Sequence, residues 1–153
     1  MGSERIFDVV QQFLHRDGWA TEIIEEGETI ATRAAGENGE WQCLAQIYEK
    51  GGIFVFYSIC PLKAPADQRP AMAEFITRAN HDLLMGNLEM DYTTGVIRCK
   101  TSINTYDEVL SPMLVKHVVH LNAITMDRYL PGISAIINER VSPAEAIARA
   151  ESA

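Results

Sequence analysis

Two groups of side chains in this sequence could carry chemistry: three cysteines and a pair of closely spaced histidines. Cys43, Cys60 and Cys99 are odd in number, widely spaced and form no Cys-x-x-Cys pair. Apolar neighbours surround each of them, which is typical of buried, reduced thiols in a cytosolic protein. An enzyme that pairs Cys60 or Cys99 with a histidine is the alternative, but buried structural thiols are much commoner than activated ones.

His117 and His120 are three residues apart, so on a helix they would share one face. A closed metal site needs more ligands, and only Asp127 could approach such a site after folding. We therefore interpret both histidines as polar helix positions and predict no metal, cofactor or catalytic residue. Asn80 adjoins an apolar helix stripe, and we expect its amide to cap main-chain groups of a strand or loop.

The charge of the chain argues against nucleic acid and membranes as partners. The 153 residues carry a net charge of −8, and the 13 lysines and arginines are scattered without a basic stripe. Such a surface repels phosphate backbones and anionic lipid. No apolar run approaches the length of a membrane span. A hydrophobic content of 47% suits one compact domain over residues 1–153, and we expect it to be cytoplasmic.

The elements that must position these side chains follow from hydrophobic periodicity and turn residues. Pro61 is predicted to end the fourth strand, and Gly86 is predicted to terminate the second helix. Pro131 and Gly132 are predicted to break the third helix. Ser111 and Ser142 have the positions of helix N-caps. Strands are expected over 21–25, 28–35, 41–48, 53–60, 87–91 and 96–104, and helices over 4–16, 70–85, 113–129, 133–140 and from residue 142 onward.

This order predicts an α+β fold in which helices pack on an antiparallel sheet. The strand over 53–60 is apolar on both faces, which suits a central strand covered on both sides. Its side chains divide into Ile53, Val55, Tyr57 and Ile59 on one face and Phe54 and Phe56 on the other. One face can take the helices, whereas the other needs a further helix, a second subunit or a ligand.

In the hairpin over 87–104, apolar and charged residues alternate along both strands. One face should therefore be apolar and packed, and the other should be charged and in contact with water. A four-residue loop at Tyr92–Gly95 would pair Asp91 with Val96, and the alternation then places Glu89 opposite Arg98. The last helix carries Ile147 as its one large apolar residue, so we expect it to fray or to dock on another element.

The order of elements and a series of short motifs resemble the YbjN-type family of small bacterial proteins over about residues 6–138. The motifs are Phe13-Leu14 before Asp17-Gly18-Trp19, Gly39-Glu40-Trp41, Phe56-Tyr57-Ser58 before Pro61, Arg78-Ala79-Asn80, Gly86-Asn87-Leu88-Glu89-Met90-Asp91, Gly95-Val96-Ile97-Arg98 with Lys100-Thr101, and Asp127-Arg128-Tyr129-Leu130-Pro131-Gly132. That family is similar in fold to type III secretion chaperones. The resemblance implies self-association and a regulatory role without catalytic residues. The alanine-rich tail after Ser142 lies outside the shared pattern.

These observations predict a non-enzymatic, protein-binding module that is chaperone-like or regulatory. We expect it to bind itself as a two-fold dimer and to bind a client protein, through apolar surface that one chain cannot cover. The candidate partner-binding residues are Phe54, Phe56, Met113 and Val118. Phe56 is expected to be buried in the core, and it belongs to the binding surface only if the isolated chain exposes it. The alternative is a regulatory domain that senses a small ligand in a pocket between helix and sheet.

Overall fold

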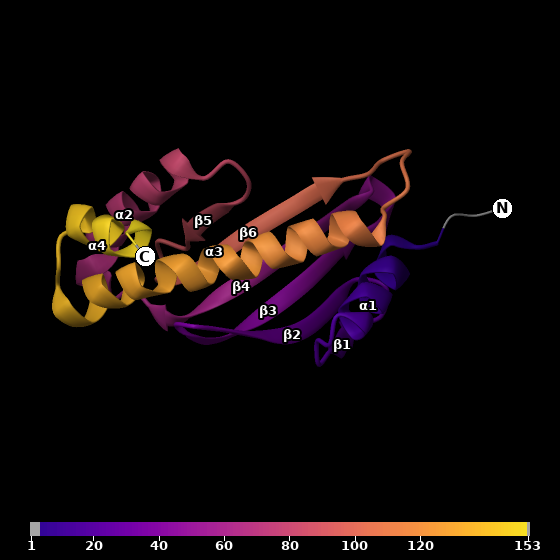
Figure 1. Cartoon of the computed structure of the whole chain (residues 1–153), viewed down its shortest axis with the longest axis horizontal. Helices are drawn as coiled ribbons and strands as arrows, with labels where there is room; N and C mark the ends of the chain where they lie inside the picture. Colours follow the sequence, from indigo (N-terminus) through magenta and orange to yellow (C-terminus); the bar gives the residue numbers. More distant parts are fainter. Residues whose placement is uncertain (1–3, 153) are drawn as a thin grey trace.

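The computed structural model describes residues 4–152, in which four α-helices and one six-stranded antiparallel sheet form an α+β fold (Figure 1). The strands are ordered β1-β2-β3-β4-β6-β5 across the sheet. They are β1 (Glu22–Glu25), β2 (Thr29–Gly36), β3 (Gly39–Tyr48), β4 (Ile53–Lys63), β5 (Asn87–Met90) and β6 (Val96–Asn104). The fold class is therefore the predicted one, with β4 near the centre of the sheet.

The helices gather on one face of the sheet and enclose a single core. They are α1 (Ile6–Arg16), α2 (Arg69–Asp82), α3 (Pro112–Glu139) and α4 (Pro143–Glu151). The long α3 runs along the sheet and contacts β4 and β6, while α2 and α4 pack on its C-terminal half (Figure 1). The last helix docks rather than frays, because Ala146 and Ala150 are buried against α2 and α3.

The side chains of the core come from one face of the sheet and from the four helices that cover it. Phe54 and Phe56 of β4 are fully buried, and they belong to the same core cluster as Val115 and Val119 of α3. The alternation that puts these phenylalanines under the helices sends Val55, Tyr57 and Ile59 to the opposite face. Tyr57 and Ile59 lie outside the core cluster and remain partly exposed.

The predicted break at Pro131 is wrong, because α3 continues through it to Glu139. A proline inside a helix removes the N–H that would bond the carbonyl four residues earlier, here that of Asp127. The Nδ2 of Asn38, in the β2–β3 turn, donates to this carbonyl over 2.9 Å. The Asp127 carboxylate in turn accepts from the main-chain N–H groups of Glu37 and Asn38 at 3.2 and 2.9 Å. The freed carbonyl is thus satisfied by a distant turn, and the helix survives.

Gly132 has a packing role instead of a helix-breaking one. A Cβ atom at this position would lie 2.6 Å from the ring of Phe75 and 3.0 Å from the carbonyl of Ala146. The absence of a side chain therefore lets α2, α3 and α4 approach closely.

Two further boundaries differ from the sequence-based expectation. Strand β4 passes Pro61 and ends at Lys63, because the pairing with β6 is irregular between Ile59 and Lys63 and tolerates a residue without an N–H. Helix α2 ends at Asp82, before Gly86, since Leu83 already has extended backbone angles. Leu84 lies within the range expected for that helix, but it follows the helix in the structure and is 96% exposed.

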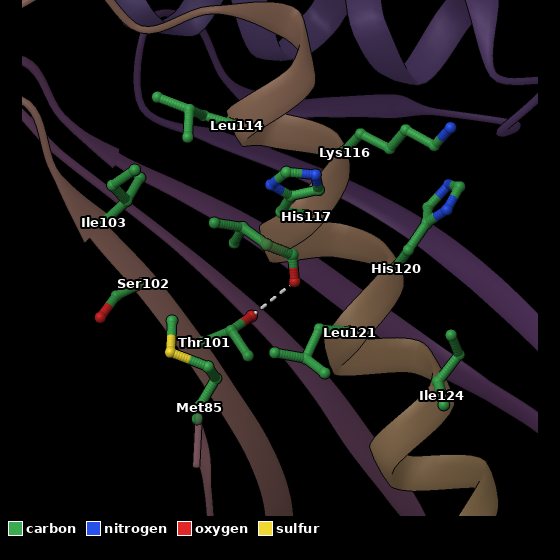
Figure 2. A pocket seen from close by; sticks show the side chains of 12 residues that line it. Met85, Thr101, Ser102, Ile103, Leu114, Lys116, His117, His120, Leu121 and Ile124 are labelled. Atoms are coloured by element: carbon green, nitrogen blue, oxygen red, sulfur yellow. Dashed lines mark hydrogen bonds between the residues drawn. The ribbon is translucent and has the colours of Figure 1, made fainter.

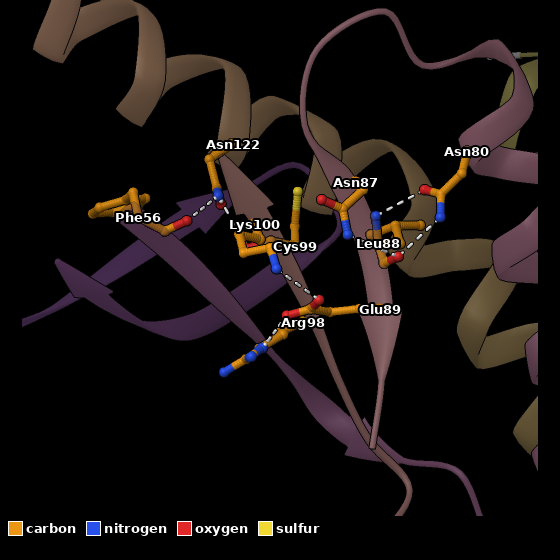
Figure 3. Close-up of polar contacts among 9 residues, drawn as sticks. All are labelled: Phe56, Asn80, Asn87, Leu88, Glu89, Arg98, Cys99, Lys100 and Asn122. Atoms are coloured by element: carbon orange, nitrogen blue, oxygen red, sulfur yellow. Dashed lines mark hydrogen bonds and ion pairs between the residues drawn. The ribbon is translucent and has the colours of Figure 1, made fainter. Parts of the chain in front are cut away.

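The predicted register of the second hairpin is confirmed. Glu89 lies opposite Arg98, and the Asp91 N–H donates to the Val96 carbonyl over 2.9 Å. Glu89 forms ion pairs with Arg98 and, at 3.1 Å, with Lys100 (Figure 3). Burial alone would raise the pKa of Glu89, but its hydrogen bonds to these two cations hold that pKa below its ordinary value.

Asn80 holds the hairpin to α2, as predicted. Its Oδ1 accepts from the Leu88 N–H over 2.8 Å, and its Nδ2 donates to the Leu88 carbonyl over 3.0 Å (Figure 3). This pair of bonds satisfies both main-chain groups of Leu88 and fixes the position of β5 at the border of the sheet.

Candidate functional site

A largely apolar concavity among the described residues lies between α3 and β6, and we call it the edge groove. It has a volume of about 520 Å³, and its walls come from α3, the end of β6 and the α2–β5 connection (Figure 2). Its apolar lining consists chiefly of Met85, Ile103, Leu114, Val118, Leu121 and Ile124. The residues from α3 recur every three or four positions, so one stripe of this helix faces the groove rather than the sheet.

The rim of the edge groove exposes large apolar side chains to water. Ile124 is 64% exposed and Met85 is 63% exposed, and Leu84 follows α2 next to Met85. Met113 lies at the start of α3 with 57% of its surface exposed. Scattered exposed apolar residues are normal, but a set that adjoins an apolar groove makes this surface the candidate site of the chain.

The charged groups of the edge groove are basic, although the chain as a whole is acidic. Lys116, His117 and His120 line it, and its twelve lining residues include neither aspartate nor glutamate. His120 Nε2 lies 2.6 Å from Asp17 Oδ2, and that oxygen also accepts from the Trp19 indole N–H over 2.9 Å. Burial acts to raise the pKa of Asp17, but these hydrogen bonds hold it below its ordinary value.

The four predicted partner-binding residues differ in their exposure, since two lie in the core and two lie at or near the edge groove. Phe54 and Phe56 are fully buried between sheet and helices, so the folded chain offers neither to a partner. The two-sided apolar pattern of β4 could not show which of its faces the helices cover. Val118 is 8% exposed at the floor of the edge groove, where its carbonyl accepts from the Thr101 hydroxyl over 2.8 Å. Met113 is exposed beside Leu114 of the groove.

A second surface without a helix is the opposite face of the sheet, which we call the open sheet face. Its centre is formed by Leu44, Val55, Tyr57 and Ile59, which are neighbours in the β3–β4 register. The guanidinium of Arg98 lies over the Tyr57 ring, 4.2 Å from the ring centroid. None of the described helices belongs to this side, and Leu44, Tyr57 and Ile59 are partly exposed.

The cysteines are placed as inert core residues. All three are buried and free of disulfides. Burial raises the pKa of Cys43 and of Cys60 to about 11, and it raises that of Cys99 to about 12. Because the thiolate is the reactive form, these thiols are weak nucleophiles at neutral pH. Within residues 4–152, no three His, Cys, Asp or Glu side chains gather in a way that could hold a metal ion.

Sequence reasoning missed Met85, Ile103 and Ile124 as surface residues of a groove. A signal was present in the unequal arms of the hairpin, since a strand over 96–104 is longer than its partner over 87–91 and its end lacks a neighbour. It also missed Asn122, a fully buried amide on α3 that the structure joins to β4 and β6 (Figure 3). An asparagine between apolar residues of a helix, here Val119 and Met126, was the available signal.

The fold and the two uncovered surfaces define a small α+β protein that has no recognised catalytic constellation among its described residues. The chain belongs to the YbjN family, whose sequence pattern matches residues 7–135 and whose description is "Putative bacterial sensory transduction regulator". No curated protein sequence matched the chain.

A solved structure confirms the architecture. The crystal structure of YbjN from E. coli, described as "a putative transcription regulator", superposes with a TM-score of 0.57 at 13% sequence identity. The match covers 78% of this chain and 86% of that one. At this identity the likeness establishes the fold. Within residues 4–152, no helix combines the length and the apolar character that crossing a bilayer requires.

Proposed function

We propose that this chain is a non-catalytic regulatory module that binds another polypeptide in the edge groove, in a chaperone-like manner. The observation that supports this function is the continuous apolar surface formed by the α3 stripe and the exposed Met85 and Ile124. Monomeric proteins seldom leave such a surface uncovered unless a partner occupies it. The family description, a regulator in sensory transduction, agrees with a protein that acts by binding.

The shape of the site favours a polypeptide over a small ligand. A volume of about 520 Å³ is within the range of small-molecule sites, and this observation supports the alternative of a ligand sensor. Such sites, however, enclose most of the ligand surface. Ile124 and Met85 at the rim are more than half exposed, so a small molecule here would stay largely in contact with water. Native mass spectrometry of the purified chain would reveal a bound small molecule as added mass.

Photo-crosslinking from the groove tests the proposal. With benzoylphenylalanine in place of Ile124, irradiation of the native host cells should join the 17.0 kDa chain to a discrete second polypeptide. The Met85→Asp substitution should reduce this product by about tenfold or more, since a charge would then face the bound apolar side chains. Met85 is 63% exposed, so this change leaves the core intact. Mass spectrometry of the crosslinked product identifies the partner.

The matched control carries the same photoreactive residue in place of Lys50, which is exposed on the 3-10 turn η1 (Glu49–Gly51). Identical products from both positions would show random encounter and would contradict a binding site in the groove. A product made of two copies of this chain would assign the edge groove to self-association. No product from position 124 would remove the proposed function.

We also propose that the chain forms a two-fold dimer through the open sheet face. The apolar centre of this face is Leu44, Val55, Tyr57 and Ile59, and no described element covers it. A closed two-fold contact between identical faces is the commonest way for a soluble chain to cover such a surface.

Sedimentation at micromolar concentration should therefore give twice the 17.0 kDa mass of one chain. The Leu44→Lys substitution should shift the species to 17.0 kDa, because it places a charge in the apolar centre of the contact. The control is Met85→Lys in the edge groove, which should leave the dimer unchanged. A wild-type chain that stays at 17.0 kDa over a wide concentration range would refute the dimer.

A further inference from the structure

We infer that the partner segment binds as an added β-strand along the free end of β6, and that it carries apolar side chains at alternate positions with acidic residues between them. This inference rests on the proposed function, since it names the conformation and chemistry of the polypeptide that the edge groove would take. It follows from the register of the sheet and from the charges of the groove.

Strand β6 has a neighbour on its outer side along only part of its length. Its pairing with β5 extends from Ile97 to Lys100. The connection between α2 and β5 then passes close to β6 at Gly86. A Cβ atom at this glycine would lie 2.7 Å from the Thr101 side chain and 3.0 Å from the Lys100 carbonyl. Beyond this crossing, no described strand lies beside the outer edge of Ser102–Asn104. This edge adjoins the edge groove, because Ser102 and Ile103 line it (Figure 2).

The direction of the main-chain groups on this edge follows from antiparallel geometry, in which alternate residues exchange their N–H and C=O groups with the same neighbour. The Asp91 N–H donates to the Val96 carbonyl, so the main-chain N–H and C=O groups of Val96 point toward β5. The main-chain groups of every second residue after Val96 point in the same direction. Thr105 is an odd number of residues after Val96, so its main-chain groups should point the other way, toward β4. Its N–H does donate to the carbonyl of Gly52, next to the start of β4. Ser102 and Asn104 therefore present main-chain donors and acceptors outward, where a further strand could bind them.

The side chains of an added strand would alternate between groove and solvent. Thr101 is buried and Ile103 is partly buried on the helix side of β6, whereas Ser102 and Asn104 are exposed on the other side. Residues of the incoming strand that lie opposite Thr101 and Ile103 would point toward the helix side as well. There they would contact the apolar stripe of α3 that includes Leu114 and Leu121.

The charges favour an acidic segment from another chain over a second copy of this one. Lys116 and His117 are among the lining residues of the groove, and none of these lining residues is acidic. Asp17, which lies outside this lining, contacts His120, and the charge of Lys116 also helps to lower its pKa. A two-fold contact in the groove would place Lys116 and His117 of one copy close to the same residues of the other. Such like-charge contacts oppose association, whereas carboxylates on the incoming strand would complement them.

Binding of synthetic peptides, followed by fluorescence anisotropy, tests the inference. The probe is a short labelled peptide of alternating valine and glutamate, compared with one of alternating valine and lysine. We expect the glutamate peptide to bind at least about tenfold more tightly, because two adjacent groups of the groove carry or can carry positive charge. Lys116→Glu should reduce this preference. The matched change Lys63→Glu should leave it unaltered, because Lys63 is exposed and pairs with Val96 at the opposite end of β6 from Ser102–Asn104.

A second pair of variants isolates the strand pairing. Ser102→Pro removes the outward N–H and crowds the edge, and an edge strand tolerates proline at a position that faces solvent. It should weaken the binding of the glutamate peptide by about tenfold, the effect expected for the loss of one hydrogen bond together with the crowding at the edge. Ser102→Ala keeps the N–H and should bind as the wild-type chain does. Circular dichroism of both variants confirms that the fold is retained.

Equal affinity of the Ser102→Pro and Ser102→Ala variants would overturn strand addition, and equal affinity of the two peptides would overturn the acidic preference. If neither peptide binds while the crosslink from position 124 to another protein persists, the inference fails and the proposed function stands. If that crosslink is also absent, the proposed function fails as well.

Discussion

Replacing Phe56 with alanine should lower the free energy of unfolding by about 3–5 kcal/mol, because the change leaves a cavity in a packed core. The side chain is fully buried. Its ring meets Trp19 edge-on with 6.0 Å between the centroids, and it meets Phe54 in the same manner at 6.5 Å. Phe56 therefore links β4 to Trp19, which follows α1, and its carbonyl accepts a hydrogen bond from Asn122 of α3.

Urea unfolding of the wild-type and Phe56→Ala chains measures this difference directly. Tyr48→Ala provides the matched control, because Tyr48 is an aromatic residue on the adjacent strand β3 but is 50% exposed. We expect the control to change stability by no more than about 0.5–1 kcal/mol. A near-neutral effect of Phe56→Ala would show that this ring is not part of the core, and would return it to the set of partner-binding candidates.

The alternation of apolar residues in the second hairpin was sufficient to predict its register. Its one-sided pattern and its four-residue loop constrain the pairing, so Glu89 lies opposite Arg98 as expected. The positions of the strands and of the helix caps Ser111 and Ser142 were also predictable, because they depend on neighbouring residues alone. The fold class follows from these local signals.

The continuity of α3 could not be predicted in this way. A proline within a helix normally ends it, and the survival of this helix depends on a donor from Asn38, 89 residues away in the sequence from Asp127. Such compensation belongs to the tertiary structure and has no local signature.

The candidate site was only partly predictable for a related reason. The pattern of β4 revealed two apolar faces but could not tell which of them the helices would cover. Phe54 and Phe56 were therefore candidates for the binding surface, and the burial of both side chains confirms the alternative expectation that Phe56 belongs to the core. The exposure of Met85 depends on where α2 ends, and this boundary was displaced by three residues, from about 85 to Asp82.

Asn122→Asp should lower the free energy of unfolding by several kcal/mol at neutral pH, since it buries a carboxylate without a cationic partner. The Asn122 amide is completely buried, and its Nδ2 lies 2.7 Å from the Phe56 carbonyl, 3.0 Å from the Cys99 carbonyl and 3.0 Å from the Thr101 hydroxyl oxygen (Figure 3). Its Oδ1 is buried without a hydrogen-bond partner among the described residues. An ionised aspartate has no donor, so its oxygens would face two main-chain carbonyls.

The loss of stability should depend on pH in a defined direction. Burial favours the neutral acid, so the pKa of the new carboxyl in the folded state should be raised above its unfolded value of about 3.9. A raised folded pKa adds stability below the unfolded value, and this contribution disappears as the pH rises through the folded pKa. The difference between Asn122→Asp and wild type should therefore be smaller near pH 4 than near pH 8, by up to about 1.4 kcal/mol for each unit by which the folded pKa is raised within that window.

Urea unfolding at both pH values measures this double difference, and taking wild type as the reference at each pH removes the acid sensitivity of native carboxylates such as Asp17 and Glu89. Their lowered pKa values stabilise the fold at neutral pH and weaken it in acid, the opposite direction to the one expected for the variant. Asn138→Asp is the matched control, because it adds the same charge to an exposed position of the same helix. If the two substitutions had the same pH dependence, the amide that joins α3 to β4 and β6 would have to be in contact with water, and the sealed core beneath α3 would be excluded.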